Sequence, residues 1–262
     1  MRNPAGMTTF ETAGPGRLYA KVPESASSAG GAAIDMTRVS VIFDMDGVLA
    51  DTEPVYLGII RDLFAWHGVV VPESRLETYV GVSSESMWTE IRREFGLRQT
   101  VAELVRIEHE DQQRRLSELP HLPPVAGVED LILALKAAGA RLGVASSSSR
   151  AVIGLILERT GLARHFDTVV SGEDVARSKP APDIFLAAAA RLNAAPAGCV
   201  VIEDSTHGVR GAKAAGMRVI GYVNPNSGRQ DVSGADLVVT ALSARLAEQV
   251  MCLAEKGPSF LR

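Results

Sequence analysis

From residue 121 onward, short apolar runs alternate with stretches of helical periodicity, and this alternation most limits the possible folds. Runs of strand length occupy residues 141–146, 167–172, 199–204, 217–222 and 236–239, and apolar residues with helical spacing occupy 127–138, 150–160, 182–192 and 206–215. Strands separated by helices of this length form a parallel sheet through right-handed crossovers. The sequence therefore predicts an α/β fold with a Rossmann-like parallel sheet flanked by helices.

Another apolar run of strand length, VSVIFD at 39–44, precedes the alternating region and suits a buried parallel strand. Three stretches of helical spacing follow it without any strand pattern between them, at 55–67, 84–95 and 100–118. We expect residues 39–52 and 121–262 to form the α/β core. Residues 53–120 should form an all-helical cap inserted after the first strand, over the carboxyl ends of the strands, where open α/β sheets bind ligands.

The N-terminal segment, residues 1–38, has a different composition. It is rich in Gly, Ala, Ser and Pro and has no continuous apolar stretch. This composition is typical of a disordered extension and not of a secretory signal, and an upstream start before a natural beginning near Met36 is the alternative. In either case the segment should carry no chemistry.

Charge and cysteine content exclude several classes of function. The net charge of -4 offers no basic field for nucleic acid or for an anionic membrane surface. The sequence contains no run of 18 or more apolar residues, so it predicts no membrane-spanning helix. Cys199 and Cys252 lack metal-ligand spacing and fit small thiols in a reducing compartment. We expect a cytoplasmic protein, monomeric by default, with no nucleic-acid or membrane partner.

Acidic and hydroxyl side chains stand where several predicted strands end. Asp44 and Asp46 follow the first strand, Ser146 ends the second, and Glu203 and Asp204 end CVVIED. Four carboxylates at one edge of a sheet repel each other in a partly dry site, and a hard divalent cation with oxygen ligands relieves that repulsion. Mg²⁺ fits best because it binds a few carboxylates together with water and substrate phosphate.

Two further groups suit phosphate binding at the same edge. Lys179 lies in the loop ARSKPAPDIF before a predicted helix, although such a lysine taken alone is more often a solvated loop residue. Ser146 begins SSSSR at the start of the next helix, where a hydroxyl and free N–H groups make an anion site or simply a helix cap. The predicted site thus combines a carboxylate nucleophile, a second acid, a metal and phosphate-holding groups. This combination indicates phosphoryl transfer through an aspartyl-phosphate.

In order and spacing, four segments resemble the motifs of the haloacid dehalogenase superfamily. They are DMDGVLADTE, a serine after the second strand, SKPAPDIF, and IEDSTHGVRGAKAAGM. The branch resembles the β-phosphoglucomutases and sugar-phosphate phosphatases, in which a helical cap follows the first motif. The resemblance spans residues 39–245 and implies that the substrate is a small phosphorylated metabolite.

The resemblance also implies a role for each motif residue. Asp44 would be the nucleophile, and Asp46 would protonate the leaving oxygen and then activate the attacking water. Ser146 and Lys179 would hold the phosphate. The implied Mg²⁺ ligands are the Asp44 carboxylate, the Asp46 backbone carbonyl, Asp204, and Glu203 through water.

The cap residues favour a phosphatase over a mutase. Tyr56 stands where the mutases have a histidine, Ser84 stands where they have an arginine, and an ungapped count puts Glu108 near the place of their cap lysine. A mutase needs such cations to hold a bisphosphate intermediate. We expect a Mg²⁺-dependent sugar-phosphate phosphatase, and the alternatives are a β-phosphoglucomutase or a catalytically silent sugar-phosphate binder.

Substrate recognition and packing in the cap can also be assigned. Ser83, Ser84 and Glu85 lie in a cap loop expected to face the core, so we expect them to read substrate hydroxyls. Trp66 and Trp88 are expected to pack inside the cap.

Overall fold

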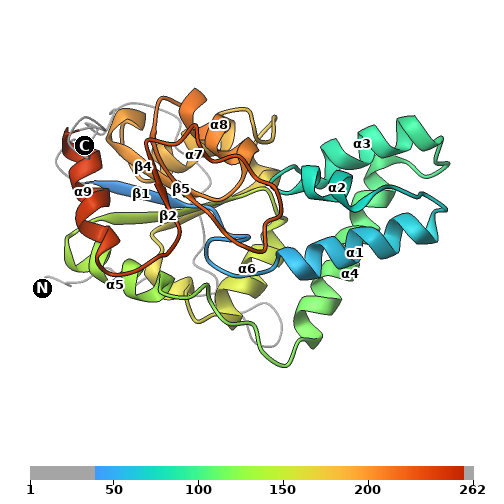
Figure 1. Cartoon of the computed structure of the whole chain (residues 1–262), viewed down its shortest axis with the longest axis horizontal. Helices are drawn as coiled ribbons and strands as arrows, with labels where there is room; N and C mark the ends of the chain where they lie inside the picture. Colours follow the sequence, from blue (N-terminus) through green and yellow to red (C-terminus); the bar gives the residue numbers. More distant parts are fainter. Residues whose placement is uncertain (1–38, 257–262) are drawn as a thin grey trace, which may run out of the picture. The chain divides into compact units, whose positions relative to one another are not determined.

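A six-stranded parallel sheet forms the centre of the protein (Figure 1). The computed structural model describes residues 39–256, and the predicted N-terminal extension, 1–38, lies outside the described residues. The strand order is β3-β2-β1-β4-β5-β6. The strands are β1 (Ser40–Phe43), β2 (Arg141–Ser146), β3 (Thr168–Ser171), β4 (Cys199–Glu203), β5 (Arg218–Tyr222) and β6 (Leu237–Val239). This architecture confirms the predicted α/β fold.

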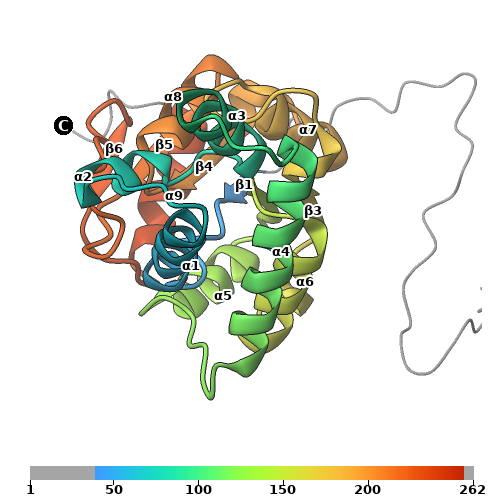
Figure 2. The same ribbon diagram turned by 90° about the vertical axis from the view of Figure 1, so that its right-hand side faces the viewer.

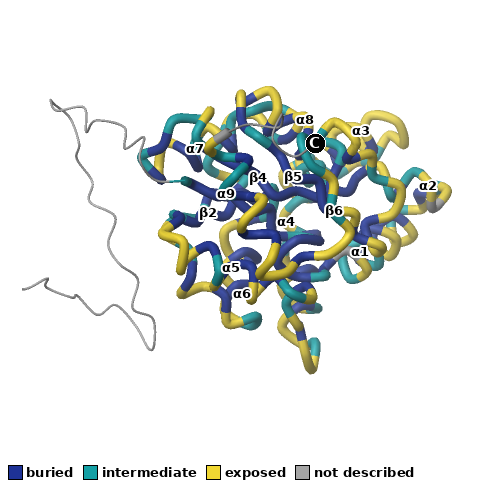
Figure 3. Tube along the Cα trace, turned by 60° about the vertical axis from the view of Figure 1, so that its left-hand side comes forward, coloured by how far each residue is buried: buried dark blue, intermediate teal, exposed yellow. Residues whose placement is uncertain are grey.

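Both faces of the sheet are buried, which explains the continuous apolar runs. In β1, Val41 and Phe43 enter one hydrophobic cluster and Ile42 enters another. The first cluster is covered by α5 (Val128–Ala137), α6 (Arg150–Arg159) and α9 (Leu246–Lys256), and the second by α7 (Asp183–Arg191) and α8 (Thr206–Ala214). In Figure 3 the tube is largely dark blue along β2, β4 and β5, whereas the surrounding helices carry many yellow residues.

Four helices lie between β1 and α5 in the sequence: α1 (Glu53–Trp66), α2 (Glu73–Leu76), α3 (Ser84–Phe95) and α4 (Val101–Glu118). Helices α1 and α4 pack against each other (Figure 2). These helices share a hydrophobic cluster, in which the buried rings of Phe64 and Trp88 meet edge to face at 5.3 Å. Thr100 and Glu103 form a capping box that fixes the start of α4. The boundaries of a separate cap domain stay a prediction.

Short 3₁₀ helices complete the connections: η1 (Glu77–Tyr79), η2 (Ala163–His165), η3 (Gly172–Asp174) and η4 (Pro196–Gly198). Of the helices between residues 39 and 256, none combines the length and apolar character needed to cross a membrane.

Two expectations about helices and packing need correction. Helix α9 was not predicted, although Leu246, Val250 and Leu253 carry helical spacing and enter the core beside the sheet. Trp66 does not pack inside the cap: its side chain is 67% exposed, and the centre of its ring lies 4.7 Å from that of the neighbouring His67, in an edge-to-face arrangement. It lies at the last position of α1, on the solvent side. Trp88 is fully buried, as expected.

Candidate active site

Lys179 forms ion pairs with two carboxylates at the carboxyl edge of the sheet. Its Nζ lies 2.5 Å from Asp44 Oδ1 and 2.7 Å from Glu203 Oε1, and all three side chains are buried. Asp44 directly follows β1, and its N–H donates to the Ile202 carbonyl of β4 at 3.0 Å. Burial alone lowers the pKa of Lys179, but the two carboxylates reverse this effect and raise it. The lysine is therefore a fixed positive charge.

Asp204 completes a buried acidic group with Asp44 and Glu203. One carboxylate oxygen from each residue lies within 4.8 Å of the others. Burial and the neighbouring Glu203 carboxylate raise the pKa values of Asp44 and Asp204. Asp204 Oδ1 is buried and has no hydrogen-bond partner in residues 39–256. An unpartnered buried acceptor beside two further carboxylates fits the ligand set of a metal cation.

The turn after Asp46 brings the backbone close to this acidic group. Gly47 has φ +76, and a Cβ built on it would lie 1.9 Å from Asp204 Oδ2. The Asn224 side chain donates from Nδ2 to the Gly47 carbonyl at 2.9 Å, and the Ser227 hydroxyl donates to Asp204 Oδ2. Sequence reasoning missed Asn224 and Ser227; Asn224, two residues after the end of β5, could have been found by the same strand-end argument.

Asp46 is held by hydroxyl groups from two segments. Its Oδ1 accepts from Thr52 Oγ1 at 2.5 Å, and its Oδ2 accepts from Ser148 Oγ at 2.9 Å and more weakly from Ser146 Oγ at 3.4 Å. Ser146 is fully buried, and its hydroxyl also accepts from the Ser148 N–H at 3.1 Å. Ser147 and Ser148, which follow it, line the pocket above Asp44. The predicted phosphate-binding serine thus orders the loop that faces this pocket.

A small inner pocket of about 40 Å³ lies between these groups and the inserted helices. Its floor contains Asp44, Asp46 and Lys179, and its opposite wall contains Tyr56 and Ser84. The pocket therefore brings the predicted chemical groups together with Tyr56 and Ser84, two of the positions expected to distinguish a phosphatase from a mutase.

Glu108 lies directly behind that opposite wall. This carboxylate is fully buried and accepts from Ser84 Oγ at 2.7 Å, from Trp88 Nε1 at 2.5 Å and from the Tyr56 hydroxyl. Burial raises its pKa to about 7, although the hydrogen bonds oppose the change. Tyr56, Ser84 and Glu108, which the sequence analysis treated as separate positions, form one hydrogen-bonded group.

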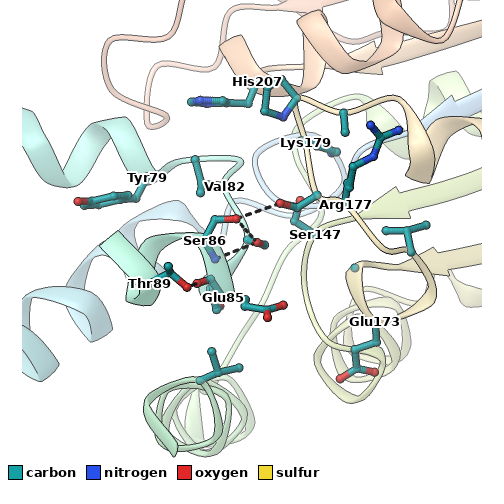
Figure 4. Close-up of a pocket in the computed structure, with 18 of the residues that line it drawn as sticks. Tyr79, Val82, Glu85, Ser86, Thr89, Ser147, Glu173, Arg177, Lys179 and His207 are labelled. Carbon is teal, nitrogen blue, oxygen red and sulfur yellow. Dashed lines mark hydrogen bonds between the residues drawn. The ribbon is translucent and has the colours of Figure 1, made fainter. Parts of the chain in front are cut away.

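A larger outer pocket of about 1020 Å³ opens beside the inner one (Figure 4). The predicted substrate-reading residues Ser83, Ser84 and Glu85 all line it. Ser83 also caps α3 by accepting from the Ser86 N–H at 3.2 Å. The Ser86 and Ser178 hydroxyls lie 3.2 Å apart and join α3 to the loop that carries Lys179.

Residues 41–222 match the family model of the haloacid dehalogenase-like hydrolases. The chain belongs to this family. Phosphatases of this family generally use a metal ion, and the buried group of Asp44, Glu203 and Asp204 fits one.

Relatives of this haloacid dehalogenase-like hydrolase include phosphatases and mutases. It is 34% identical to the phosphorylated carbohydrates phosphatase of Thermotoga maritima over 71% of this chain and 85% of that protein. It is 33% identical to the β-phosphoglucomutase of Bacillus subtilis over 78% of this chain and 90% of that one. A crystal structure of a CbbY variant from Rhodobacter sphaeroides, in complex with xylulose-1,5-bisphosphate, superposes with a TM-score of 0.68 at 27% identity, over 78% and 95% of the two chains.

Proposed function

We propose that the protein is a Mg²⁺-dependent phosphatase that releases phosphate from a small sugar phosphate. The observation that carries the proposal is the inner pocket, where Asp44, paired with buried Lys179, and Asp46 face one small space beside a buried acidic group. Relatives named as a phosphorylated carbohydrates phosphatase and a fructose-1-phosphate phosphatase support the substrate class.

In the first half-reaction, Asp44 acts as the nucleophile. Its carboxylate oxygen forms a bond to phosphorus while the bond from phosphorus to the sugar oxygen breaks. Asp46 gives its proton to the departing oxygen, so the sugar leaves as a neutral alcohol. The hydroxyls of Thr52 and Ser148 hold the Asp46 carboxyl in place for this transfer. Lys179 balances negative charge on Asp44 and on the incoming phosphate.

In the second half-reaction, Asp46 acts as a base. It takes a proton from a water molecule, whose oxygen attacks the phosphorus of the aspartyl-phosphate and regenerates the Asp44 carboxylate. The proton gained by Asp46 restores the acid needed for the next turnover. Asp44, Asp204 and the Asp46 carbonyl would hold Mg²⁺, which would neutralise charge on the phosphate oxygens. Ser146 holds the phosphate-facing loop, and Glu203 orients Lys179.

The helices of residues 53–120 act as the cap that selects water as the acceptor. Tyr56 and Ser84 offer hydroxyls to the inner pocket, and Glu108 behind them is an acid. Residues 53–120 contain no lysine. A bisphosphate intermediate would require cations at these positions, so transfer to water is favoured over the mutase reaction. Ser83, Ser84 and Glu85 would contact the sugar.

A phosphate-release assay across sugar monophosphates tests this function. With Mg²⁺, we expect equal amounts of free sugar and phosphate and no isomeric sugar phosphate, and EDTA should stop the release. Conversion of β-glucose 1-phosphate to glucose 6-phosphate with a bisphosphate primer would instead identify a mutase. Tight binding of a sugar phosphate without turnover would identify a silent binder.

A further inference from the structure

The outer pocket differs in charge from the inner pocket where phosphate would react. We infer that this pocket admits a neutral, hydroxyl-rich leaving group and repels a second phosphate, which makes sugar monophosphates the substrates and bisphosphates poor ones. The inference rests on the proposed function and names the substrate class of the same site. It assigns a specificity role to Glu85 and Glu173, two carboxylates that the catalytic steps do not use.

The cations that line the outer pocket are already neutralised. Arg177 forms a bidentate pair with Asp183, at 2.8 Å and 3.1 Å, and Lys179 pairs with Asp44 and Glu203. In Figure 4, Arg177 lies beside Lys179 at the core side of the pocket.

Two histidines that line the pocket add no charge near neutral pH. Burial lowers the pKa values of both His109 and His207 below the ordinary histidine range. The carboxylate of Glu173 opposes the shift at His109, and that of Glu203 opposes it at His207, but burial is the larger effect at each ring.

Three glutamates line the same pocket, and in the described residues only one of them belongs to an ion pair. Glu90 pairs with Arg75 at 2.9 Å. Glu85, near the start of α3, and Glu173, in η3, have no ion-pair partner in the described part of the chain. Glu173 only accepts a 3.3 Å hydrogen bond from the Arg150 N–H. Figure 4 shows these two carboxylates on the α3 side and the core side of the pocket.

The polar groups that remain are mostly hydroxyls, which bind neutral alcohols as donors and acceptors. The hydroxyl-bearing residues of the pocket include Thr78, Ser83, Ser86, Thr89, Ser147 and Ser178. A second phosphate in this space would carry close to two negative charges toward Glu85 and Glu173. A cleft lined by one sign of charge excludes ligands of that sign, and added salt weakens the effect. Discrimination therefore comes from repulsion as well as from fit.

The test compares each monophosphate with its own bisphosphate at low ionic strength and pH 7.5. Suitable pairs are fructose 1-phosphate with fructose 1,6-bisphosphate, glucose 1-phosphate with glucose 1,6-bisphosphate, and ribulose 5-phosphate with ribulose 1,5-bisphosphate. We consider the pair whose monophosphate is hydrolysed fastest. In that pair we expect kcat/KM for the monophosphate to exceed kcat/KM for the bisphosphate by about tenfold or more. The preference should shrink in 0.5 M NaCl.

Charge-removing variants separate repulsion from shape. Glu85→Gln combined with Glu173→Gln should reduce the preference several-fold by improving use of the bisphosphate, whereas Glu158→Gln, an exposed change on α6, should leave it unchanged. Equal or faster hydrolysis of the bisphosphate by the unmodified protein would overturn the inference while leaving the phosphatase proposal intact. An unaltered preference in the double variant would overturn the role of the two glutamates. Absence of phosphate release from all six compounds would refute the proposed function and the inference together.

Discussion

Replacing Glu108 by glutamine should change how the stability of the protein depends on pH. Glu108 is fully buried, and its hydrogen-bond donors are the Ser84 hydroxyl, the Trp88 indole and the Tyr56 hydroxyl. Glutamine keeps the shape and one oxygen acceptor but cannot ionise. The perturbation therefore removes one titrating group from the interior with little change in volume.

The magnitude follows from the raised pKa. Burial raises the pKa of Glu108 from 4.5 to about 7 in the folded protein. Because the folded state holds this proton more tightly than the unfolded state, the group lowers the free energy of unfolding as pH rises through the window between these values. The loss should be about 2 to 3 kcal/mol between pH 5 and pH 8. Glu108→Gln removes it, so the variant should gain that amount relative to the unmodified protein.

The assay is urea unfolding of both proteins at pH values from 5 to 8 in the presence of EDTA. The quantity of interest is how the difference in free energy of unfolding between the variant and the unmodified protein changes with pH. A constant offset from altered hydrogen bonds does not affect this change. Asp44 and Asp204, whose raised pKa values also affect stability, are present in both proteins and cancel as well. Glu110→Gln, an exposed change on α4, is the matched control and should follow the unmodified protein. A stability difference independent of pH would refute the reasoning about Glu108.

Three further substitutions test the geometry around the acidic group. Gly47→Ala places a methyl group 1.9 Å from Asp204 Oδ2 at φ +76, so kcat should fall about 100-fold or more, and near-normal kcat would contradict the close approach. Lys179→Met leaves Asp44 and Glu203 without their cation and should lower the free energy of unfolding by about 3 kcal/mol in urea titrations; an unchanged midpoint would show that the pairs contribute nothing. Saturating Mg²⁺ should raise the melting temperature of the unmodified protein and not that of Asp204→Asn, and equal shifts would place the metal elsewhere.

The sheet could be predicted because each of its strands has a recognisable local sequence pattern. VSVIFD and CVVIED are continuous apolar runs, and the structure buries residues of each run on both faces of the sheet. The position of Asp44 at the end of β1 and of Glu203 at the end of β4 then follows from parallel pairing alone. Strand ends that share an edge bring their side chains together, whatever the distance in sequence.

The partners of these side chains were harder to predict because they depend on tertiary packing. Glu108 lies on a helix whose exposed positions also carry many charges, and only the packing of α4 against α3 turns it toward Ser84 and Trp88. Ser227 reaches Asp204 from a loop after β5 that has no regular spacing. Helix α9 is different, because its Leu246, Val250 and Leu253 carry helical spacing in the sequence and could have been recognised locally.

Trapping of a phosphorylated enzyme tests the central claim most directly. With p-nitrophenyl phosphate, whose leaving group needs no proton, Asp46→Asn should still be phosphorylated but should hydrolyse the intermediate slowly. Intact-protein mass spectrometry with Mg²⁺ should then show one added phosphoryl group in Asp46→Asn, and peptide mapping should locate it at Asp44. The double variant with Asp44→Asn should gain no mass. Phosphate release that persists in Asp44→Asn, or a phosphoryl group on another residue, would contradict the account.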